Sequence, residues 1–153
     1  MLPESLRDNS TAAALADIAT AGKLEFGELT IEVAPANILE ALRRAKTALG
    51  FTRLSTVTGV DRFPAEPRYE VVYHLQTIGN KERLRLKARV HSDNPEIESG
   101  CPVYRSANWY EREVFDFFGI RFLKHPDLKR IMLPEEFEGY PLRKDFPVTG
   151  MRY

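Results

Sequence analysis

The stretch SANWYEREVFDFFGIRFLKHPDLKRIMLPEEFEGYPLRKDFP (residues 106–147) organises the rest of the chain. It contains the single tryptophan and six of the nine phenylalanines, between charged residues in an ordered pattern. Its first part predicts a helix that begins at Asn108, because an Asn followed three residues later by Glu111 has the form of a capping box. Gly119 then ends the helix, since glycine turns the chain readily with a positive φ.

The predicted helix carries one carboxylate on its apolar arc. A spacing of about 100° per residue places Glu111 between Phe115 and Phe118, while the opposite arc holds the charged residues Arg112, Glu113 and Asp116. A buried carboxylate must be hydrogen-bonded, paired or neutral. Two interpretations stay open. Glu111 folds back onto the Asn108 amide as half of the cap, or it pairs with a downstream cation among Lys124, Lys129, Arg130, Arg143 and Lys144.

The second part of the stretch predicts short extended pieces separated by stops. Residues 130–133 are typical of a short strand closed by Pro134, and residues 134–137 favour one helical turn with proline at its first position. The glycines and prolines that follow exclude a long helix or a central strand. We therefore expect a single domain over residues 1–133 and an extended C-terminal arm over residues 134–153.

The expected arm carries apolar side chains that would gain free energy from being covered, namely Phe137, Tyr140, Leu142 and Phe146. Arg143 and Lys144, which stand beside Asp145, carry donors whose hydrogen bonds would fix the register of the arm against acidic groups on a neighbour. We expect the arm to dock on a partner subunit. The alternative, that it folds back on its own sheet, stays open.

Hydrophobic spacing predicts the remaining elements. Two helices are expected over residues 11–21 and 36–49. Strands are expected over residues 24–33, with a turn or bulge at Gly27, and over residues 54–60, 69–77 and 83–91. The last two form a hairpin around Gly79-Asn80, and residues 93–106 form a crossover loop. The order predicts an α+β, two-layer domain with helices packed on one face of a mostly antiparallel sheet.

The strand over residues 83–91 has a basic face, made of Arg83, Arg85, Lys87, Arg89 and His91. Such a face is compatible with phosphate or nucleic acid, but no aromatic residues interleave to stack bases. A solvated face with cross-strand pairs to residues such as Glu70 is therefore favoured. A protein partner also fits this face.

Composition excludes several classes of protein. The 22 basic residues balance the 22 acidic ones, so neither nucleic acid nor anionic lipid is expected as a bulk partner. No apolar run approaches the roughly 20 residues that span a bilayer, and residues 1–10 lack the apolar run of a signal peptide. The single cysteine, Cys101, makes no internal disulfide and suits a reducing compartment.

The sequence contains no recognisable catalytic or cofactor motif. Neither GxGxxG nor GxxxxGK[ST] is present, and one cysteine with three separated histidines predicts no iron–sulfur cluster or structural zinc site. Glu111, Glu113 and Asp116 are candidates for an acid/base cluster. Helical acids more often pair with neighbours, as Arg112 would with Asp116 four residues later, so we expect a structural or interface role. We predict no catalytic, cofactor-binding or metal-binding residue in this chain.

The ordered residues of the stretch resemble a known family. Glu111-Arg112-Glu113, Asp116-Phe117-Phe118, His125, Lys129 and Ile131-Met132 match the signature of the 30-kDa subunit of respiratory complex I, which in bacteria is the proton-pumping NADH:quinone oxidoreductase. The segments ANWYERE, FGIRF, HPDLKRI and GYPLRKDFP are also similar to that family, and the resemblance covers roughly residues 24–148. Residues 101–105 depart from the family's sequence pattern. The motif and expected interface residues are Glu111, Arg112, Glu113, Asp116, His125, Asp127, Lys129, Arg130, Arg143, Lys144 and Asp145.

The resemblance implies a non-catalytic subunit in the peripheral arm of the proton-pumping complex, on the cytoplasmic side of the cell membrane. It implies contact with the large quinone-site subunit and the subunit of the terminal iron–sulfur cluster, with FMN and the iron–sulfur clusters in partner subunits. Membrane contact would come only through the complex. The alternatives are the equivalent subunit of a ferredoxin-linked, F420H2-linked or membrane-bound hydrogenase complex, and a freestanding binding module that uses the basic strand face.

Overall fold

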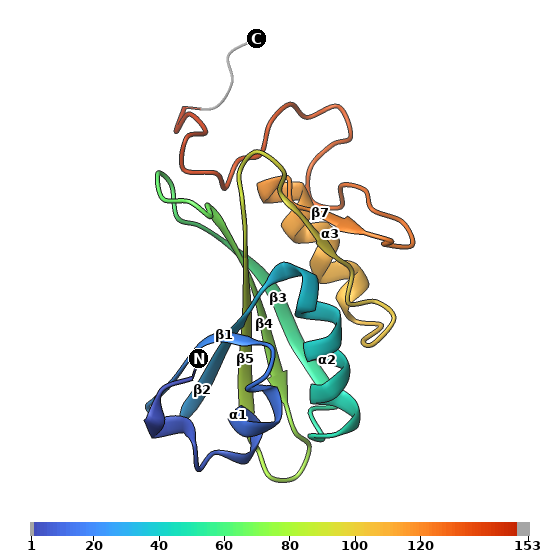
Figure 1. Cartoon of the computed structure of the whole chain (residues 1–153). Coiled ribbons are helices and arrows are strands. Elements are labelled where there is room, and N and C mark those ends of the chain that lie inside the picture. Colours follow the sequence, from blue (N-terminus) through green and yellow to red (C-terminus); the bar gives the residue numbers. More distant parts are fainter. Residues whose placement is uncertain (1, 150–153) are drawn as a thin grey trace.

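A five-stranded mixed sheet forms one layer of the protein in this computed structural model, which describes residues 2–149 (Figure 1). Its order is β1-β2-β5-β4-β3, with bounds β1 Ala19–Glu25, β2 Glu28–Val33, β3 Arg53–Asp61, β4 Tyr69–Gln76 and β5 Arg83–Val90. Neighbouring strands are antiparallel except β2 and β5, which are parallel. The predicted α+β class with a mostly antiparallel sheet is confirmed.

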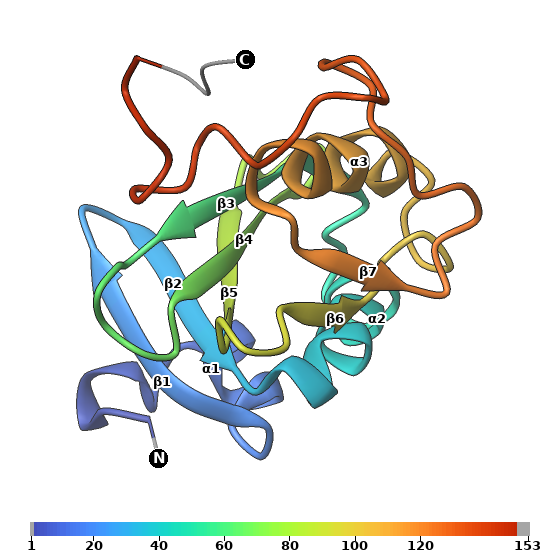
Figure 2. The same cartoon turned by 90° about the horizontal axis from the view of Figure 1, so that it is seen from above.

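The second layer contains the helices α1 Ser10–Leu15, α2 Ile38–Thr47 and α3 Ala107–Phe118. Two 3-10 turns, η1 Glu4–Leu6 and η2 Pro35–Asn37, precede α1 and α2. A two-stranded parallel pair, β6 Glu96–Glu98 with β7 Arg121–Leu123, completes this layer. Seen from above, α2, α3 and the β6–β7 pair lie on the same side of the sheet (Figure 2). The core lies between the two layers.

The strict alternation of β5 explains why one face of the sheet belongs to the core. Leu84, Leu86, Ala88 and Val90 are buried, whereas the basic residues between them face the other way. Strand β4 contributes its own core set, Tyr69, Val71, Tyr73 and Leu75. Because the side-chain period of a strand is two, the sequence pattern defines this face. Strands β4 and β5 pair antiparallel across the turn at residues 77–82, so the hairpin prediction is confirmed.

The helix expected over residues 11–21 is wrong beyond Leu15, because strand β1 begins at Ala19. The expected strand over residues 24–33 is in fact a hairpin of β1 and β2, and a turn at Gly27 is confirmed. Phe26 and Gly27 have φ of 54° and 76°, which matches a turn with two left-handed residues. Pairing with β2 across the hairpin overrides the helical propensity of the alanines.

Two predictions about the decisive stretch are also corrected. Helix α3 begins at Ala107 with Ser106 at its N-cap and no side-chain cap bond, so Asn108 is not the cap. Its predicted end is confirmed, since Gly119 has a φ of 76° and donates its N–H to the Phe115 carbonyl at 2.8 Å. Residues 130–133 bend rather than form a strand, and the short strand is β7, whose partner β6 lies inside the expected crossover loop.

Residues 134–149 run back along α3 and the end of β3 (Figures 1 and 2). The Leu142 N–H donates to the Phe117 carbonyl at 3.2 Å, and the rings of Phe137 and Phe146 stack with centroids 6.3 Å apart. Residues 134–137 form an isolated turn rather than the predicted turn of helix. These contacts agree with the fold-back alternative, while the domain division and docking on a partner stay predictions. Residues 150–153 of the expected arm lie outside the described residues.

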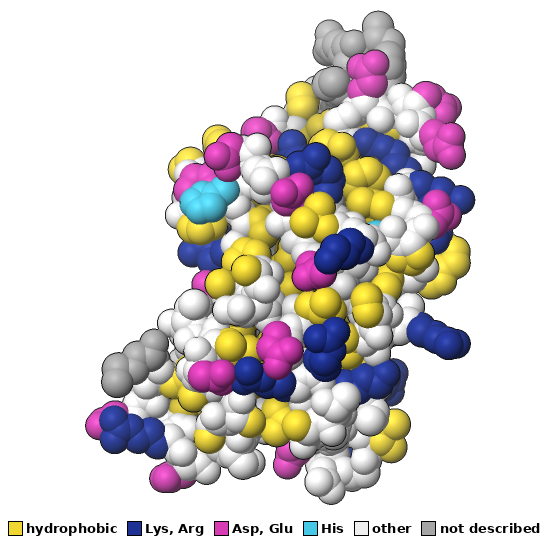
Figure 3. Space-filling view, turned by 45° about the vertical axis from the view of Figure 1, so that its right-hand side comes forward, with side chains coloured by type: hydrophobic (Ala, Val, Ile, Leu, Met, Phe, Trp, Pro, Cys, Tyr) yellow, Lys and Arg dark blue, Asp and Glu magenta, His cyan; other side chains and the backbone are white. Residues whose placement is uncertain are grey.

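The surface beside the helices mixes both signs of charge. In Figure 3, Lys and Arg side chains alternate with Asp and Glu side chains, and hydrophobic side chains reach the surface between them. Exposed large hydrophobic residues include Trp109, Met132 and Leu142, which come from α3 and the segment that follows it. Within residues 2–149, no helix has the length and apolarity required to cross a membrane.

Candidate functional site

Helix α3 buries three charged side chains of the motif. Glu111 and Asp116 are fully buried and Arg112 is 7% exposed, whereas Glu113 faces solvent. The arc predicted to be polar is therefore covered at Arg112 and Asp116, because the chain after β7 packs against these two residues. Each buried charge of α3 must find its partners inside the protein.

Glu111 lies in a pocket formed by the loop before α3. Its Oε1 accepts a hydrogen bond from the Ser99 hydroxyl at 2.5 Å, and its Oε2 accepts one from the Gly100 N–H at 2.8 Å. The Cys101 thiol lies 3.5 Å from Oε1. Burial raises the pKa of Glu111, although these donors act in the opposite direction. Both predicted roles of Glu111 are wrong: it caps nothing, and no lysine or arginine in the described chain pairs with it.

His125 closes this Glu111 pocket. Its Nε2 is 3.0 Å from the Asn108 carbonyl and 4.0 Å from Glu111 Oε1, and its Nδ1 accepts the Asp127 N–H at 3.0 Å. These contacts require the ring proton on Nε2, with Nδ1 unprotonated. Burial lowers the pKa of His125, which agrees with a neutral ring.

Cys101, Glu111 and His125 bring Sγ, a carboxylate oxygen and a ring nitrogen within 4.8 Å of one another, as a metal site requires. The existing hydrogen bonds, however, occupy both ring nitrogens and both carboxylate oxygens. A metal would have to replace these bonds. The arrangement is a hydrogen-bonded network that positions the loop, the helix and the residue after β7.

Asp116 binds the chain after β7 through backbone donors. Its Oδ2 accepts the N–H groups of Ile131, Met132 and Leu133 at 3.1, 2.7 and 3.0 Å. Arg130 Nη1 lies 3.1 Å from Oδ1, and its Nη2 donates to the Gly139 carbonyl at 2.8 Å. We call this the Asp116 anchor. It explains why residues 130–133 bend: three consecutive N–H groups converge on one carboxylate.

Arg112 does not pair with Asp116, so the pairing expected from helical spacing is wrong. It reaches Asp127 instead, with Nη2 3.4 Å from Oδ2, and its guanidinium lies 4.6 Å from the Trp109 ring centroid. Lys129 approaches the same carboxylate at 3.3 Å. The segment 125–127 (His-Pro-Asp) therefore contacts α3 through both His125 and Asp127.

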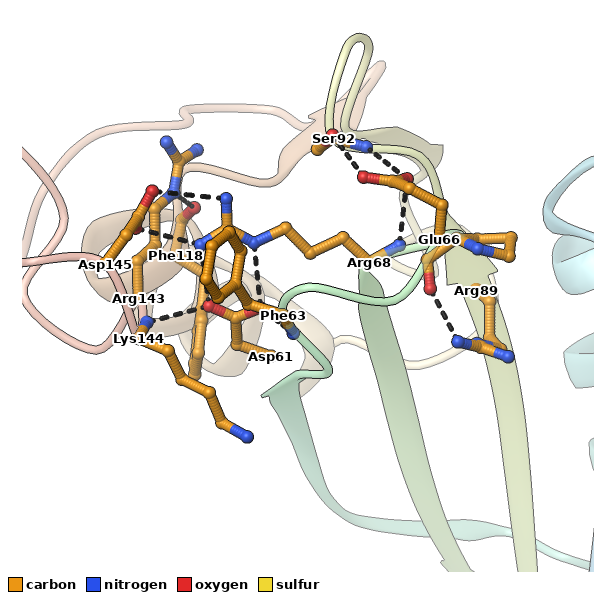
Figure 4. A network of polar contacts seen from close by, with 11 residues as sticks. Asp61, Phe63, Glu66, Arg68, Arg89, Ser92, Phe118, Arg143, Lys144 and Asp145 are labelled. Atoms are coloured by element: carbon orange, nitrogen blue, oxygen red, sulfur yellow. Dashed lines mark hydrogen bonds and ion pairs between the residues drawn. The ribbon is translucent and has the colours of Figure 1, made fainter.

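A second contact joins the arm to the sheet, and we call it the Asp61 clasp (Figure 4). Asp61, at the end of β3, receives two bonds from Arg68 at 2.8 and 2.9 Å and the Lys144 N–H at 2.8 Å. Arg68 also reaches Asp145 at 2.9 Å. Burial acts to raise the pKa of Asp61, but Arg68 and the backbone donors outweigh it and lower that pKa to about 2.

Arg143 completes the attachment of the arm. Its Nε donates to the Phe118 carbonyl at 2.6 Å, so it satisfies one of the free carbonyls at the C-terminus of α3. The guanidinium lies 4.5 Å from the ring centroid of Tyr140 and 5.3 Å from that of Tyr69. Of the predicted interface residues, Arg143 and Asp145 are thus engaged within the chain itself.

Most of the chain matches a known family. The model of the respiratory-chain NADH dehydrogenase 30-kDa subunit family matches residues 31–152. The chain belongs to this family. It is 49% identical over 122 residues to an NADH-quinone oxidoreductase subunit of Rhizobium etli, covering 78% of this chain and 65% of that protein. It is 41% identical over 153 residues to an NADH-quinone oxidoreductase subunit of Ruegeria pomeroyi, covering 97% of this chain and 76% of that protein.

Solved structures agree with this membership. A trypsin-resistant fragment of Nqo5 has a TM-score of 0.64 and 31% identity, covering 70% of this chain and 89% of that one. A chain in the membrane-bound sulfane sulfur reductase, an archaeal respiratory membrane complex, has a TM-score of 0.75 and 29% identity. The match covers 89% of this chain and 82% of that one. The fold of the 30-kDa family is therefore shared beyond the NADH-linked relatives.

In this 30-kDa family chain, seven of the predicted residues form three contact groups. Glu111 and His125 meet in the Glu111 pocket, Asp116 and Arg130 meet in the Asp116 anchor, and Arg112 and Lys129 both approach Asp127. Arg143 and Asp145 instead attach the arm, through the Phe118 carbonyl and Arg68. Glu113 and the Lys144 side chain are exposed.

Sequence reasoning missed Ser99, Asp61 and Arg68, which complete the Glu111 pocket and the Asp61 clasp. Ser99 lies 12 residues before Glu111, in a loop rather than on the helix. Asp61 and Arg68 meet the arm across 83 and 77 residues of chain. No local pattern connects residues at such separations, and only the Asp61–Arg68 pair itself, seven residues apart, is close in sequence.

Proposed function

We propose that the chain is a non-catalytic subunit in the peripheral arm of a proton-pumping NADH:quinone oxidoreductase. The observation that carries this proposal is the family match over residues 31–152, together with relatives named as subunits of NADH-quinone oxidoreductase. In this role the chain supports assembly and rigidity. Its partners are the large quinone-site subunit and the subunit of the terminal iron–sulfur cluster, on the cytoplasmic side of the membrane.

The site geometry supports a structural contribution. The buried acids of the motif, Glu111 and Asp116, accept hydrogen bonds from residues before and after α3 and thereby join the helix to both segments. The motif thus holds the chain's own segments in register and presents a preformed surface to neighbours. In the proposed assembly, FMN and the iron–sulfur clusters belong to partner subunits, and this chain carries no electrons.

Purification through a tag on this chain tests the proposal. From detergent-solubilised membranes of the native organism, the tagged chain should co-purify with NADH:quinone activity and with flavin and iron–sulfur absorbance. The isolated chain should have neither absorbance and should not oxidise NADH with an artificial acceptor. A tagged chain that elutes alone, or an isolated chain with a near-stoichiometric chromophore, would contradict the proposal.

A second candidate is the equivalent subunit of a respiratory complex that does not use NADH. The match to a chain of the archaeal sulfane sulfur reductase complex favours it, because the same fold serves a differently named reductase there. The same purified assembly separates the two candidates. Reduction of quinone by NADH supports the first, whereas an assembly driven by reduced ferredoxin or F420H2 but not by NADH supports the second.

A further inference from the structure

The face of the sheet opposite the helices carries a hollow that the motif network does not use. Its volume is about 440 Å³, and we call it the sheet hollow. Three strands and the start of β2 supply its polar lining, with side chains from Glu28, Thr56, His74, Gln76, Arg83 and Arg85. It includes part of the basic strand face that the sequence singled out.

Strand register explains why these side chains gather. Thr56 of β3 lies opposite His74 of β4, and His74 lies opposite Arg85 of β5. In the next row, Gln76 lies opposite Arg83. Between Leu54 and Thr56 the register shifts, so Ser55 is an extra residue, and its buried Oγ has no hydrogen-bond partner within the described chain. Such bulges are over-represented beside functional sites, where they re-aim side chains.

The two arginines of the hollow retain unused donors. Glu28 is their shared acidic neighbour, 3.5 Å from Arg83 Nη1 and 3.4 Å from Arg85 Nη2. Charge-assisted hydrogen bonds are usually about 2.7–2.9 Å long, so both contacts are loose. Each guanidinium has about five N–H donors. Across residues 2–149, the only other side-chain bond of either group is from Arg85 to the Thr30 hydroxyl at 3.3 Å. Two cations therefore face one carboxylate.

The groups around His74 agree with an electropositive hollow. Burial lowers the pKa of His74, and the charges of Arg85 and Lys87 lower it further, while Glu28 acts in the opposite direction. A neutral imidazole can donate one hydrogen bond without adding charge. The lining thus combines two charged forks with neutral donors from His74, Thr56 and Gln76.

We propose that the sheet hollow binds a carboxylate side chain from an acidic segment of a neighbouring subunit, held by Arg85 and Arg83. The proposal rests on the proposed function, since it requires an assembly of several chains. Planar guanidinium groups bind carboxylates through two parallel hydrogen bonds, which gives both affinity and orientation. The excess of cations over acids in the hollow favours an acidic segment over a basic or apolar one.

Charge reversal at Arg85 tests this inference. Membranes that lack this subunit are titrated with purified full-length chain, and the apparent Kd for incorporation is measured. Arg85→Glu should weaken incorporation by about tenfold or more, because it places two acids against the incoming carboxylate. Arg43→Glu is the matched control. Arg43 is an exposed arginine on α2 that also has a long contact, 3.7 Å, to a glutamate.

The outcomes are distinct. Failure of the wild-type chain to incorporate would overturn the proposed function and this inference with it. If the wild-type chain incorporates and Arg85→Glu binds as tightly as Arg43→Glu, the inference alone is overturned. Arg85→Gln, with a circular dichroism spectrum and melting temperature like those of the wild type, separates lost binding from misfolding and should give an intermediate Kd. Inorganic phosphate is also titrated while the His74 ring signals are followed by NMR, and a Kd below about 1 mM would overturn the inference by assigning a small anion instead.

Discussion

The Glu111 pocket and the Asp116 anchor lie on the same helix, α3, yet they satisfy a buried carboxylate in different ways. In the pocket, the donors are a hydroxyl, an amide N–H and a thiol, and no lysine or arginine of the described chain reaches the carboxylate. In the anchor, three amide N–H groups and a guanidinium converge on it. The Glu111 pocket holds a loop without a lysine or arginine to balance the carboxylate. The Asp116 anchor holds the segment that leads into the arm, and there a guanidinium balances the carboxylate.

The comparison shows what each region requires of its acid. The Glu111 pocket requires a hydrogen-bond acceptor of the right shape, which an amide can imitate. The Asp116 anchor and the Asp61 clasp require negative charge, because each contains an arginine that would lose its partner although its side chain is only about a tenth exposed, 10% for Arg130 and 9% for Arg68. Leaving one member of a buried ion pair alone costs more free energy than losing a hydrogen bond between neutral groups.

Removal of Asp116 should have the largest effect. Asp116→Ala leaves three amide N–H groups and Arg130 without their acceptor, so we expect a loss of about 3–5 kcal/mol in the free energy of unfolding, measured with urea. Glu113→Ala, on the exposed side of the same helix, is the control and should change it by less than about 0.5 kcal/mol. Similar small losses for both variants would remove Asp116 from its anchoring role.

Substitution of Glu111 sharpens the comparison. Glu111→Ala leaves the Ser99 hydroxyl and the Gly100 N–H without their acceptor, and we expect a loss of about 2–3 kcal/mol, several times that of Glu113→Ala. Glu111→Gln retains an acceptor and should recover most of the loss, whereas Asp116→Asn should recover little because Arg130 stays unpaired. Equal recovery at both positions would contradict the difference between the two regions.

Sequence reasoning found α3, its end at Gly119 and the sheet hairpin, because each is encoded within a short window. It placed Glu111 correctly as a buried acid but not its partners. Those partners lie in a loop that α3 meets only in the folded chain, so no spacing along the helix reports them. The same limit applies to the arm. Its apolar residues could be recognised from the sequence, but its partners in the Asp61 clasp could not, because those bonds join residues 77 and 83 positions apart.

The pH dependence of stability should have opposite signs at Glu111 and Asp61. The folded pKa of Asp61 is about 2, below its unfolded value of 3.8, so its contribution is present above about pH 4 and is lost as the pH falls toward 2. The folded pKa of Glu111 is raised above its unfolded value of 4.5, so its contribution is full below that value and declines as the pH rises through the folded pKa.

Urea unfolding of wild type, Asp61→Asn and Glu111→Gln across pH 2–8 measures both contributions. The stability advantage of wild type over Asp61→Asn should shrink on acidification. Relative to Glu111→Gln, wild type should instead gain stability on acidification. Parallel profiles for the two variants would show that both acids titrate alike and would contradict the distinction.

The smallest effect is expected at the outer edge of the Asp61 clasp. Asp145 is half exposed, so Asp145→Asn should cost about 0.5 kcal/mol despite its 2.9 Å contact with Arg68. A double-mutant cycle with Arg68→Met measures the coupling free energy of the pair. A coupling of about 3 kcal/mol, the size expected of a buried pair, would show that the arm depends on this exposed contact more than on the bond from the Lys144 N–H to Asp61.

Amide exchange in the isolated full-length chain tests most directly whether buried acids hold the arm on its own domain. The structure predicts slow exchange at the N–H groups of Ile131, Met132 and Leu133, which donate to Asp116, and of Leu142 and Lys144, which donate to Phe117 and Asp61. In Asp116→Asn the first three should lose protection selectively. Protection across residues 137–147 that appears only in the assembled complex would contradict this account and would show that a partner subunit holds the arm.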